Sequence, residues 1–319
     1  MKIRSISLLS LAFASANLCS MSGTFAATPL YQWNFDSANG ANTGTAAGGT
    51  LALDVGVTAG PTGYPSGSFS GTGVSGSAGD HALNASNSYD NYWGGQSYSP
   101  ITNAAAVSSI DLTGVSQFTI TLWVQRSGNN NVDLLNIGST ATPGQTSSPG
   151  ISIGLDGNWA NGVRVGVNGH TSYTGDLWGS GYNSNWVFLA FAYNGNNGAY
   201  WGQSAMNALY GGGDNNAAII TGDTSSAASV AQNLGLHDGG YWNSAGLPSV
   251  GSTATAFLAN DGGTTNGFNG QLDDIRIYNS LLSVSDIEAV RQSALVPEPS
   301  TAALLGAMGV MTFLRRRRF

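Results

Sequence analysis

The stretch Phe268–Val290, with the sequence FNGQLDDIRIYNSLLSVSDIEAV, decides the fold class of this chain. In its first half, Gln271–Asn279, apolar and polar residues alternate around the paired acids Asp273 and Asp274. Alternation of this kind, with β-branched and aromatic residues and an asparagine at the end, predicts a β-strand.

The second half of the stretch predicts the only helix that we expect in the body of the protein. Ser283 can cap the first turn with Asp286 three residues later, and Ile287 and Val290 share one face of a helix over residues 283–292. We expect this short C-terminal helix to close one end of a β-structure.

Further alternating runs lie upstream and are bounded by glycine, asparagine, aspartate or proline. They are Leu30–Phe35, Gln117–Gln125, Gly150–Asp156, Val163–Gly169 and Trp186–Gly195. Many short strands separated by turn residues predict an all-β sandwich or barrel. The stretches Gly40–Asp80 and Ala199–Gly251 lack a clear strand pattern, and we expect long loops broken by short strands there.

The residues between Thr28 and Leu295 include no cysteine and no lysine. A chain of this size can bury enough apolar surface to fold without disulfides. Sixteen acidic residues against four arginines leave this part with a net charge of about −12. Such a surface repels phosphate backbones, so nucleic-acid binding is excluded, and its neutral polar groups suit ligands such as sugars.

The N-terminus has the pattern of a secretory signal peptide. Lys2 and Arg4 precede the mostly apolar run Ile6–Leu18, and Thr24–Ala27 offers small residues for cleavage. We therefore divide the chain into a signal peptide (1–27), a single folded domain (28–294) and a C-terminal tail (295–319).

Three segments of the domain resemble a known family: FTITLWVQ at 118–125, NWVFLAFAYNGNNGAYWGQ at 185–203, and the opening stretch at 268–290. They are similar to LamG-like members of the concanavalin A-like lectin and glucanase group. The resemblance covers about residues 30–291. It implies a jelly roll of two packed antiparallel sheets. For such a domain delivered outside the cell we expect a non-catalytic role in carbohydrate binding or adhesion.

The tail resembles the PEP-CTERM sorting signal. Its motif is Val296, Pro297, Glu298 and Pro299, followed by the apolar run Ala302–Leu314 and the basic end Arg315, Arg316, Arg317 and Arg318. The resemblance implies a transmembrane sorting helix in the inner membrane, processing by an exosortase, and delivery to the cell surface or the extracellular space. Four arginines after an apolar run would hold this end on the cytoplasmic side. An ordinary C-terminal membrane anchor is the alternative.

Carboxylates in suitable pairs are scarce, so we do not expect an enzyme. The only glutamates are Glu288, in the expected helix, and Glu298, in the tail. Glycoside hydrolysis needs two carboxylates on either side of one bond. Asp273 and Asp274 are adjacent, and neighbours on a strand point to opposite faces. The histidines His81, His170 and His237 lie in separate contexts that resemble loops.

One structural calcium ion is the cofactor that the resemblance implies, held where the two ends of the domain meet. Asp36 follows the first strand, and Asp273 and Asp274 lie in the last. Calcium binds oxygen ligands from carboxylates and carbonyls, which these positions supply. The alternative is that Asp36 caps a turn and the paired acids lie at a strand edge.

Aromatic residues in polar, glycine-rich contexts are the candidates for contact with a glycan: Tyr92, Trp93, Trp178, Tyr241 and Trp242. Aromatic rings match the apolar faces of sugars. Trp33, Trp123 and Trp186 lie within strand runs, and we expect them in the core. A polysaccharide-degrading enzyme of the same fold and a purely structural matrix protein remain as alternatives.

Overall fold

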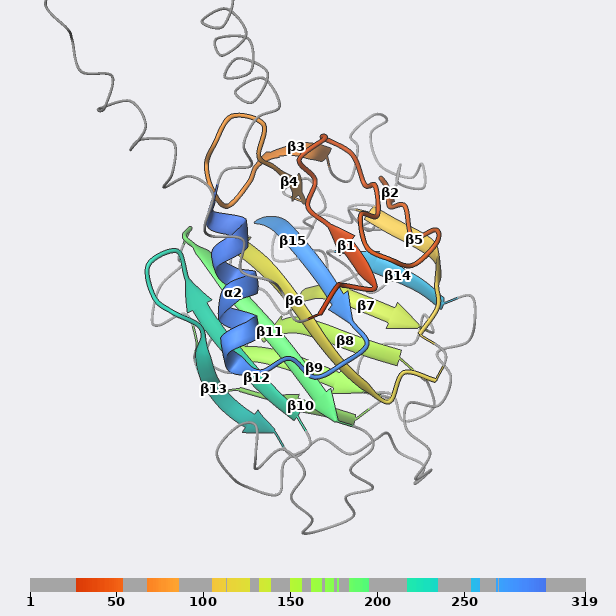
Figure 1. The fold of residues 1–319 in the computed structure, drawn as a ribbon, viewed down its shortest axis with the longest axis vertical. Coiled ribbons are helices and arrows are strands. Elements are labelled where there is room, and N and C mark those ends of the chain that lie inside the picture. Colours follow the sequence, from red (N-terminus) through yellow and green to blue (C-terminus); the bar gives the residue numbers. More distant parts are fainter. Residues whose placement is uncertain are drawn as a thin grey trace, which may run out of the picture.

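The computed structural model of the chain describes residues 27–53, 68–85, 105–112, 114–126, 132–138, 150–156, 162–167, 170–174, 177, 184–194, 217–234, 254–258, 268 and 270–296. The described parts form two antiparallel β-sheets, packed face to face, and one helix (Figure 1).

The larger sheet has eight strands. In spatial order they are β13 (Ser229–Leu234), β12 (Ala217–Asp223), β11 (Trp186–Asn194), β6 (Gln117–Arg126), β15 (Gly270–Tyr278), β4 (His81–Asn84) and β3 (Ser68–Thr72), and β1 (Tyr31–Trp33) also pairs with β15. The strand predicted at 271–279 is therefore in the middle of this sheet, hydrogen-bonded to β6, β4 and β1.

The second sheet has seven strands. Their order is β10 (His170–Tyr173), β9 (Gly162–Val167), β8 (Gly150–Asp156), β7 (Val132–Gly138), β14 (Ala254–Leu258), β5 (Ala105–Ile110) and β2 (Ala52–Leu53). Neighbouring strands in both sheets run antiparallel. This arrangement confirms the two-sheet antiparallel sandwich expected from the sequence.

The main core fills the space between the two sheets. In β8, for example, Ile151, Ile153 and Leu155 are buried in the main cluster of apolar side chains. Trp33 lies in the same cluster and donates a hydrogen bond from Nε1 to the carbonyl oxygen of Gly49 at 2.7 Å. Alternation along β8 thus sends every second side chain into this core.

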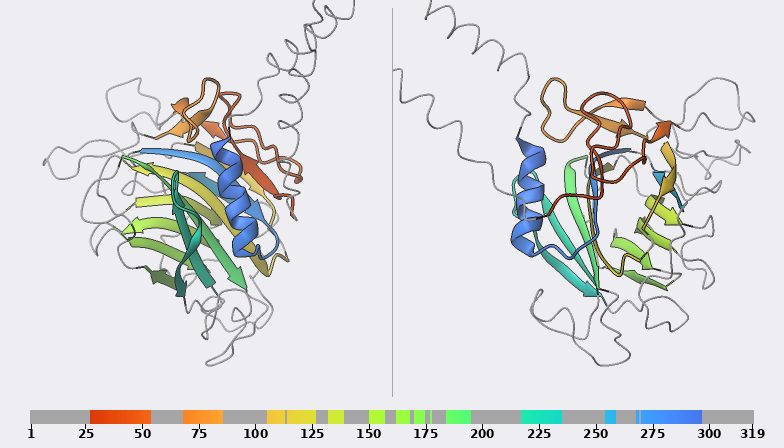
Figure 2. Two further views of the ribbon diagram at one scale, coloured as in Figure 1. Left: turned by 60° about the vertical axis from the view of Figure 1, so that its left-hand side comes forward. Right: turned by 45° about the vertical axis from the view of Figure 1, so that its right-hand side comes forward.

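A second apolar cluster lies on the outer face of the eight-stranded sheet, beneath the helix α2 (Val284–Leu295). Trp123, Phe188 and Ile220 belong to the sheet side of this cluster, and Ile287 and Val290 to the helix side. Figure 2 shows α2 lying against that face. The expectation that the helix closes one end of the sandwich was wrong. The helix packs on the face of the sheet because the wide apolar patch there offers it more surface to bury.

The capping signal for α2 is confirmed. Asp286 donates from its backbone nitrogen to the Ser283 hydroxyl at 3.1 Å, and Ser283 donates from its backbone nitrogen to the Asp286 carboxylate at 3.3 Å. The helix begins after Ser283 as predicted but continues to Leu295, three residues beyond the predicted end.

Two of the three histidines lie in strands and not in loops. His81 begins β4 and His170 begins β10, while His237 lies outside the described residues. The strands were missed because both are short and follow glycine-rich sequence, where the alternating pattern is brief. The expectation that Trp33, Trp123 and Trp186 belong to the core is confirmed, since each is at most 8% exposed.

Candidate functional site

The candidate site forms where the first and last strands of the domain meet. β1 runs antiparallel to β15, with Gln32 opposite Arg276. Asp36 follows β1 by three residues, and Asp273 and Asp274 lie in β15 four and three residues before Tyr31's partner, Ile277. These three acids from opposite ends of the domain line one pocket.

A bulge in β15 aims both paired acids into this pocket. The register between β15 and β6 shifts between Asp273 and Arg276, and Asp274 has a φ of 42°. An extra residue in the left-handed region breaks the alternation of a strand. The expectation that these neighbours point to opposite faces was therefore wrong.

Four segments form the walls of the pocket, which has a volume of about 300 Å³. They are the N-terminal segment with Gln32, Asn34, Asp36 and Ser37, the β3–β4 connection with Ser75, Ser77, Ala78, Gly79 and Asp80, the β15 residues Asp273, Asp274 and Arg276, and the end of α2 with Ser293, Ala294 and Val296. Four carboxylates and one guanidinium thus line a single pocket, which we call the acidic pocket.

Backbone amides and Arg276 hold the two central carboxylates. Asp273 accepts hydrogen bonds from the backbone nitrogens of Val74, at 2.9 Å to Oδ2, and of Asp274, at 2.7 Å to Oδ1. Asp274 Oδ1 forms an ion pair with Arg276 Nε at 2.8 Å and accepts from Gln32 Nε2 at 3.4 Å. Asp274 Oδ2 is buried, and no group in the described part of the chain donates a hydrogen bond to it.

Burial dominates the electrostatics of the pocket. Desolvation raises the pKa of Asp273 well above its ordinary value, and the negative charges of Asp274 and Asp80 raise it further. Burial alone would lower the pKa of Arg276, but the Asp274 carboxylate offsets this and raises it. The excess negative charge beside Asp273 is a cost that a bound cation would remove.

The donor set suits a hard divalent cation in part. Asp274 Oδ2 supplies an oxygen without a partner, and Asn34, Ser75 and Ser77 supply neutral oxygens to the same pocket. Calcium accepts a mixture of carboxylate, amide and water oxygens. Within the described part of the chain, however, no three acidic or histidine side chains converge closely enough to form a ready-made metal cage. Any ion here would rely on Asp273 and Asp274 together with neutral ligands.

Asp80 and Arg276 are the charged residues of the pocket that the sequence did not reveal. Asp80 ends a glycine- and serine-rich connection and accepts from the backbone nitrogen of Ser75 at 2.7 Å. Asp80 directly precedes β4, a strand that the sequence pattern did not predict. Nothing in the spacing connects it with Asp273, which lies 193 residues further on.

The other candidate residues fall outside the described residues. This applies to the predicted glycan contacts Tyr92, Trp93, Trp178, Tyr241 and Trp242, and to the sorting residues from Pro297 onward. Val296, the first residue of the sorting motif, is the C-cap of α2 and is 63% exposed. Among the described residues, no helix combines the length and apolar character that a membrane crossing requires.

Comparison with known families identifies one segment. Residues 295–318 match the PEP-CTERM protein-sorting motif. This motif marks the chain for export through the membrane and for sorting to the bacterial surface or beyond, and it implies processing by an exosortase. No curated protein matches the sequence of this chain.

Several solved structures resemble the chain weakly. Domain 4 of AbnA, an extracellular GH43 arabinanase from Geobacillus stearothermophilus in complex with arabinotriose, matches at 16% identity and a TM-score of 0.46, over 83% of this chain and 98% of that domain. The binding domain of botulinum neurotoxin serotype G matches at 12% identity and 0.44, over 83% and 51%. The CBM40 of Ruminococcus gnavus IT-sialidase, bound to alpha2,3 sialyllactose, matches at 13% identity and 0.35, over 60% and 95%.

Proposed function

We propose that this protein is a non-catalytic, LamG-like glycan-binding or adhesion module that acts at the bacterial surface or in the extracellular matrix. The observation that carries the proposal is the PEP-CTERM match at residues 295–318, directly after a β-sandwich. A sandwich sorted to the surface meets polysaccharides and neighbouring cells, and its side chains determine which of these it binds.

Loop aromatics are the residues that we assign to glycan contact. The strand tryptophans Trp33, Trp123 and Trp186 are buried and therefore cannot contact a sugar. Tyr92, Trp93, Trp178, Tyr241 and Trp242 are set among glycine, asparagine and aspartate. Aromatic rings beside such polar groups match the apolar face and the hydroxyl rim of a pyranose.

The contacts of the acidic residues favour binding over catalysis. Glu288 is paired with Arg291 at 2.7 Å, and its Oε2 also accepts from the backbone nitrogen of Ala228. Asp273 and Asp274 share a pocket, but they are only 2% and 4% exposed, and three of their four oxygens already accept hydrogen bonds. General acid–base work on a sugar needs a carboxyl group that reaches the scissile bond.

We assign one structural calcium ion to the acidic pocket, with Asp273 and Asp274 as charged ligands and Asp36 in the surrounding wall. The support is Asp274 Oδ2, which has no hydrogen-bond partner among the described residues, and the accumulation of negative charge around Asp273. When bound, the ion would supply positive charge that stabilises the junction of the N-terminal segment, the β3–β4 connection and β15. The chain's own residues hold that junction together through the hydrogen bonds of Asp273 and Asp274.

Glycan-array binding with purified protein tests the proposed function. Trp93→Ala and Trp242→Ala should each reduce binding at least tenfold while leaving the melting temperature unchanged. Trp201→Ala, the same change in another polar stretch, is the matched control and should bind as the wild type does. Release of reducing sugars from a polysaccharide would support the degradative enzyme instead, and an array without any binding would favour a structural matrix protein.

A further inference from the structure

The sorting tail leaves the folded domain from the wall of the acidic pocket. Ser293, Ala294 and Val296 line this pocket, and the sorting motif begins in the same place, at residue 295. Residues that determine the charge of the pocket and residues that anchor the tail are therefore neighbours in space.

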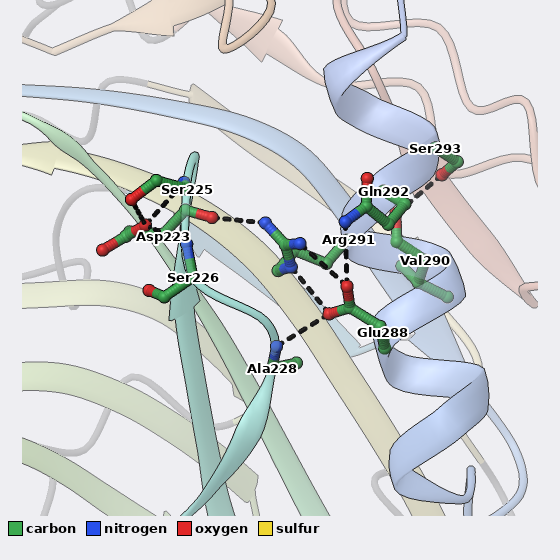
Figure 3. Close-up of polar contacts among 9 residues, drawn as sticks. All are labelled: Asp223, Ser225, Ser226, Ala228, Glu288, Val290, Arg291, Gln292 and Ser293. Atoms are coloured by element: carbon green, nitrogen blue, oxygen red, sulfur yellow. Dashed lines mark hydrogen bonds and ion pairs between the residues drawn. The ribbon is translucent and has the colours of Figure 1, made fainter.

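The middle of α2 has its own attachments to the domain. Figure 3 shows Arg291 paired with both oxygens of Glu288 and donating to the carbonyl oxygen of Asp223. Glu288 in turn accepts from the backbone nitrogen of Ala228 at 2.7 Å. These contacts connect the middle of the helix to the turn between β12 and β13 and do not involve the acidic pocket.

The last turn of α2 is attached through the pocket. Arg276 donates from Nη2 to Ser293 Oγ at 2.9 Å, and its Nε pairs with Asp274 Oδ1 at 2.8 Å. Ser293 Oγ also donates to the carbonyl oxygen of Val290 at 2.7 Å. One buried guanidinium therefore contacts both the pocket carboxylate and the end of the helix.

This end of the helix has few stabilising features of its own. The last turn carries no basic residue to balance the helix dipole, and the C-cap is Val296 in an extended conformation, not a glycine. Helix ends of this kind fray, and fraying here exposes the chain around the sorting motif.

We propose that a divalent cation in the acidic pocket controls how firmly the last turn of α2 is held, and thereby how close to the domain the sorting tail can be cut. This rests on the calcium site proposed above. A cation that selects the folded arrangement of Asp274 also stabilises the contacts formed in that arrangement, and these include the Arg276–Ser293 hydrogen bond. With the cation bound, the helix is protected to its end, and cleavage is confined to the residues beyond Val296. Without it, the last turn opens and cleavage within the helix becomes possible.

The chain offers a direct probe of this opening. Trypsin cuts after lysine and arginine, and the domain contains no lysine and only Arg126, Arg164, Arg276 and Arg291. All four are buried, at 9% exposure or less. Three lie in strands, whereas Arg291 lies in α2. Cleavage after Arg291 reports local opening of the helix, and cleavage after Arg126 reports opening of the sheet.

The experiment uses the chain without its expected signal peptide, residues 28–319, in mild detergent. Trypsin is added together with a short arginine peptide whose cleavage reports protease activity. In calcium chloride, cleavage after Arg291 should be at least fivefold slower than in EDTA, with a smaller effect after Arg126. Trypsin should cleave the Ser293→Ala variant rapidly after Arg291 in both conditions. Ser285→Ala, on the first turn of α2, should retain the full calcium effect.

Calorimetric titration with calcium separates the two proposals. Suppose that both the wild type and Ser293→Ala bind calcium with measurable heat, but cleavage after Arg291 is equally fast in calcium and in EDTA. This result would overturn the proposed coupling between the cation and the last turn of α2, while the calcium site itself would stand. Absence of any binding heat would overturn the site and the coupling together. A calcium effect that survives in Ser293→Ala would also overturn the role of the Arg276–Ser293 contact.

Discussion

The acidic pocket and the contact between α2 and the β12–β13 turn both combine carboxylates with an arginine, yet their acids behave in opposite ways. The pKa of Asp273 is raised, because burial and the neighbouring acids Asp274 and Asp80 disfavour its charge. The pKa of Glu288 is lowered to about 2, because the hydrogen bond from Arg291 and that from Ala228 outweigh its modest desolvation. The pocket therefore accumulates charge in excess of its partners, whereas the helix contact is internally balanced.

This difference indicates what each region can do. A balanced pair with its hydrogen bonds satisfied stabilises the fold and offers nothing to a ligand. A buried carboxylate with excess negative charge and an unpartnered oxygen favours a bound cation. Helix α2 touches both regions, one at its middle and one at its end.

The largest effect should come from breaking the balanced contact. Arg291→Ala should lower the free energy of unfolding by about 3 kcal/mol, because it removes a buried side chain and its hydrogen bonds to the Asp223 carbonyl oxygen and the Glu288 carboxylate. Urea denaturation measures this change. Gln292→Ala, which removes an exposed contact to the same glutamate, is the control and should cost far less. Equal costs for the two variants would show that the contact is merely a surface pair.

Calcium binding in the acidic pocket should change the free energy of unfolding by nearly as much. At a calcium concentration a hundredfold above the dissociation constant, the folded state should gain about 2.7 kcal/mol. The melting temperature should rise accordingly from EDTA to calcium chloride in wild type and in Glu288→Gln. Asp274→Ala should remove the increase. A wild type that melts at one temperature in both conditions would contradict the assignment of the acidic pocket.

Sequence patterns were sufficient for the parts of the fold that depend on local order. The run Gly150–Asp156 was predicted with its observed bounds, and α2 was placed by its Ser283 capping signal. Strands rich in alanine, such as β12 and β5, were missed because small side chains leave little contrast between the two faces.

The geometry of the acidic pocket could not be predicted from the sequence, for a different reason. Alternation predicts opposite directions for Asp273 and Asp274, and only the bulge in β15, with its positive φ at Asp274, turns both into one pocket. A bulge is a response to the neighbouring strands, so it leaves little trace in the sequence of one strand. Asp80 was missed for the same reason, since its place beside Asp273 depends on how β4 pairs with β15.

A smaller effect should follow at the start of α2. Ser283→Ala removes the side chain that accepts from the Asp286 backbone and should cost about 1 kcal/mol. Ser285→Ala removes a hydroxyl that lies 2.8 Å from Ser283 Oγ but leaves the bond from the Asp286 backbone in place, so it should cost less than Ser283→Ala in the same denaturation experiment. Because the cap lies at the opposite end from the pocket, Ser283→Ala should keep the full calcium shift, and loss of that shift would mean that the two ends of α2 are not independent.

The smallest effect should be the pH dependence of the balanced contact. The folded pKa of Glu288, at about 2, lies below its unfolded value of 4.5. A depressed carboxyl pKa adds stability that is present above pH 4.5 and is lost as the pH falls toward 2. Glu288→Gln lacks this titration, so the wild type should exceed it by about 0.5 kcal/mol at pH 7, where the pair is partly screened by solvent, and the two should converge near pH 2. A difference that stays constant over this range would show that Arg291 holds Glu288 through its hydrogen bonds alone, and the contrast with Asp273 would then lie in burial and not in charge.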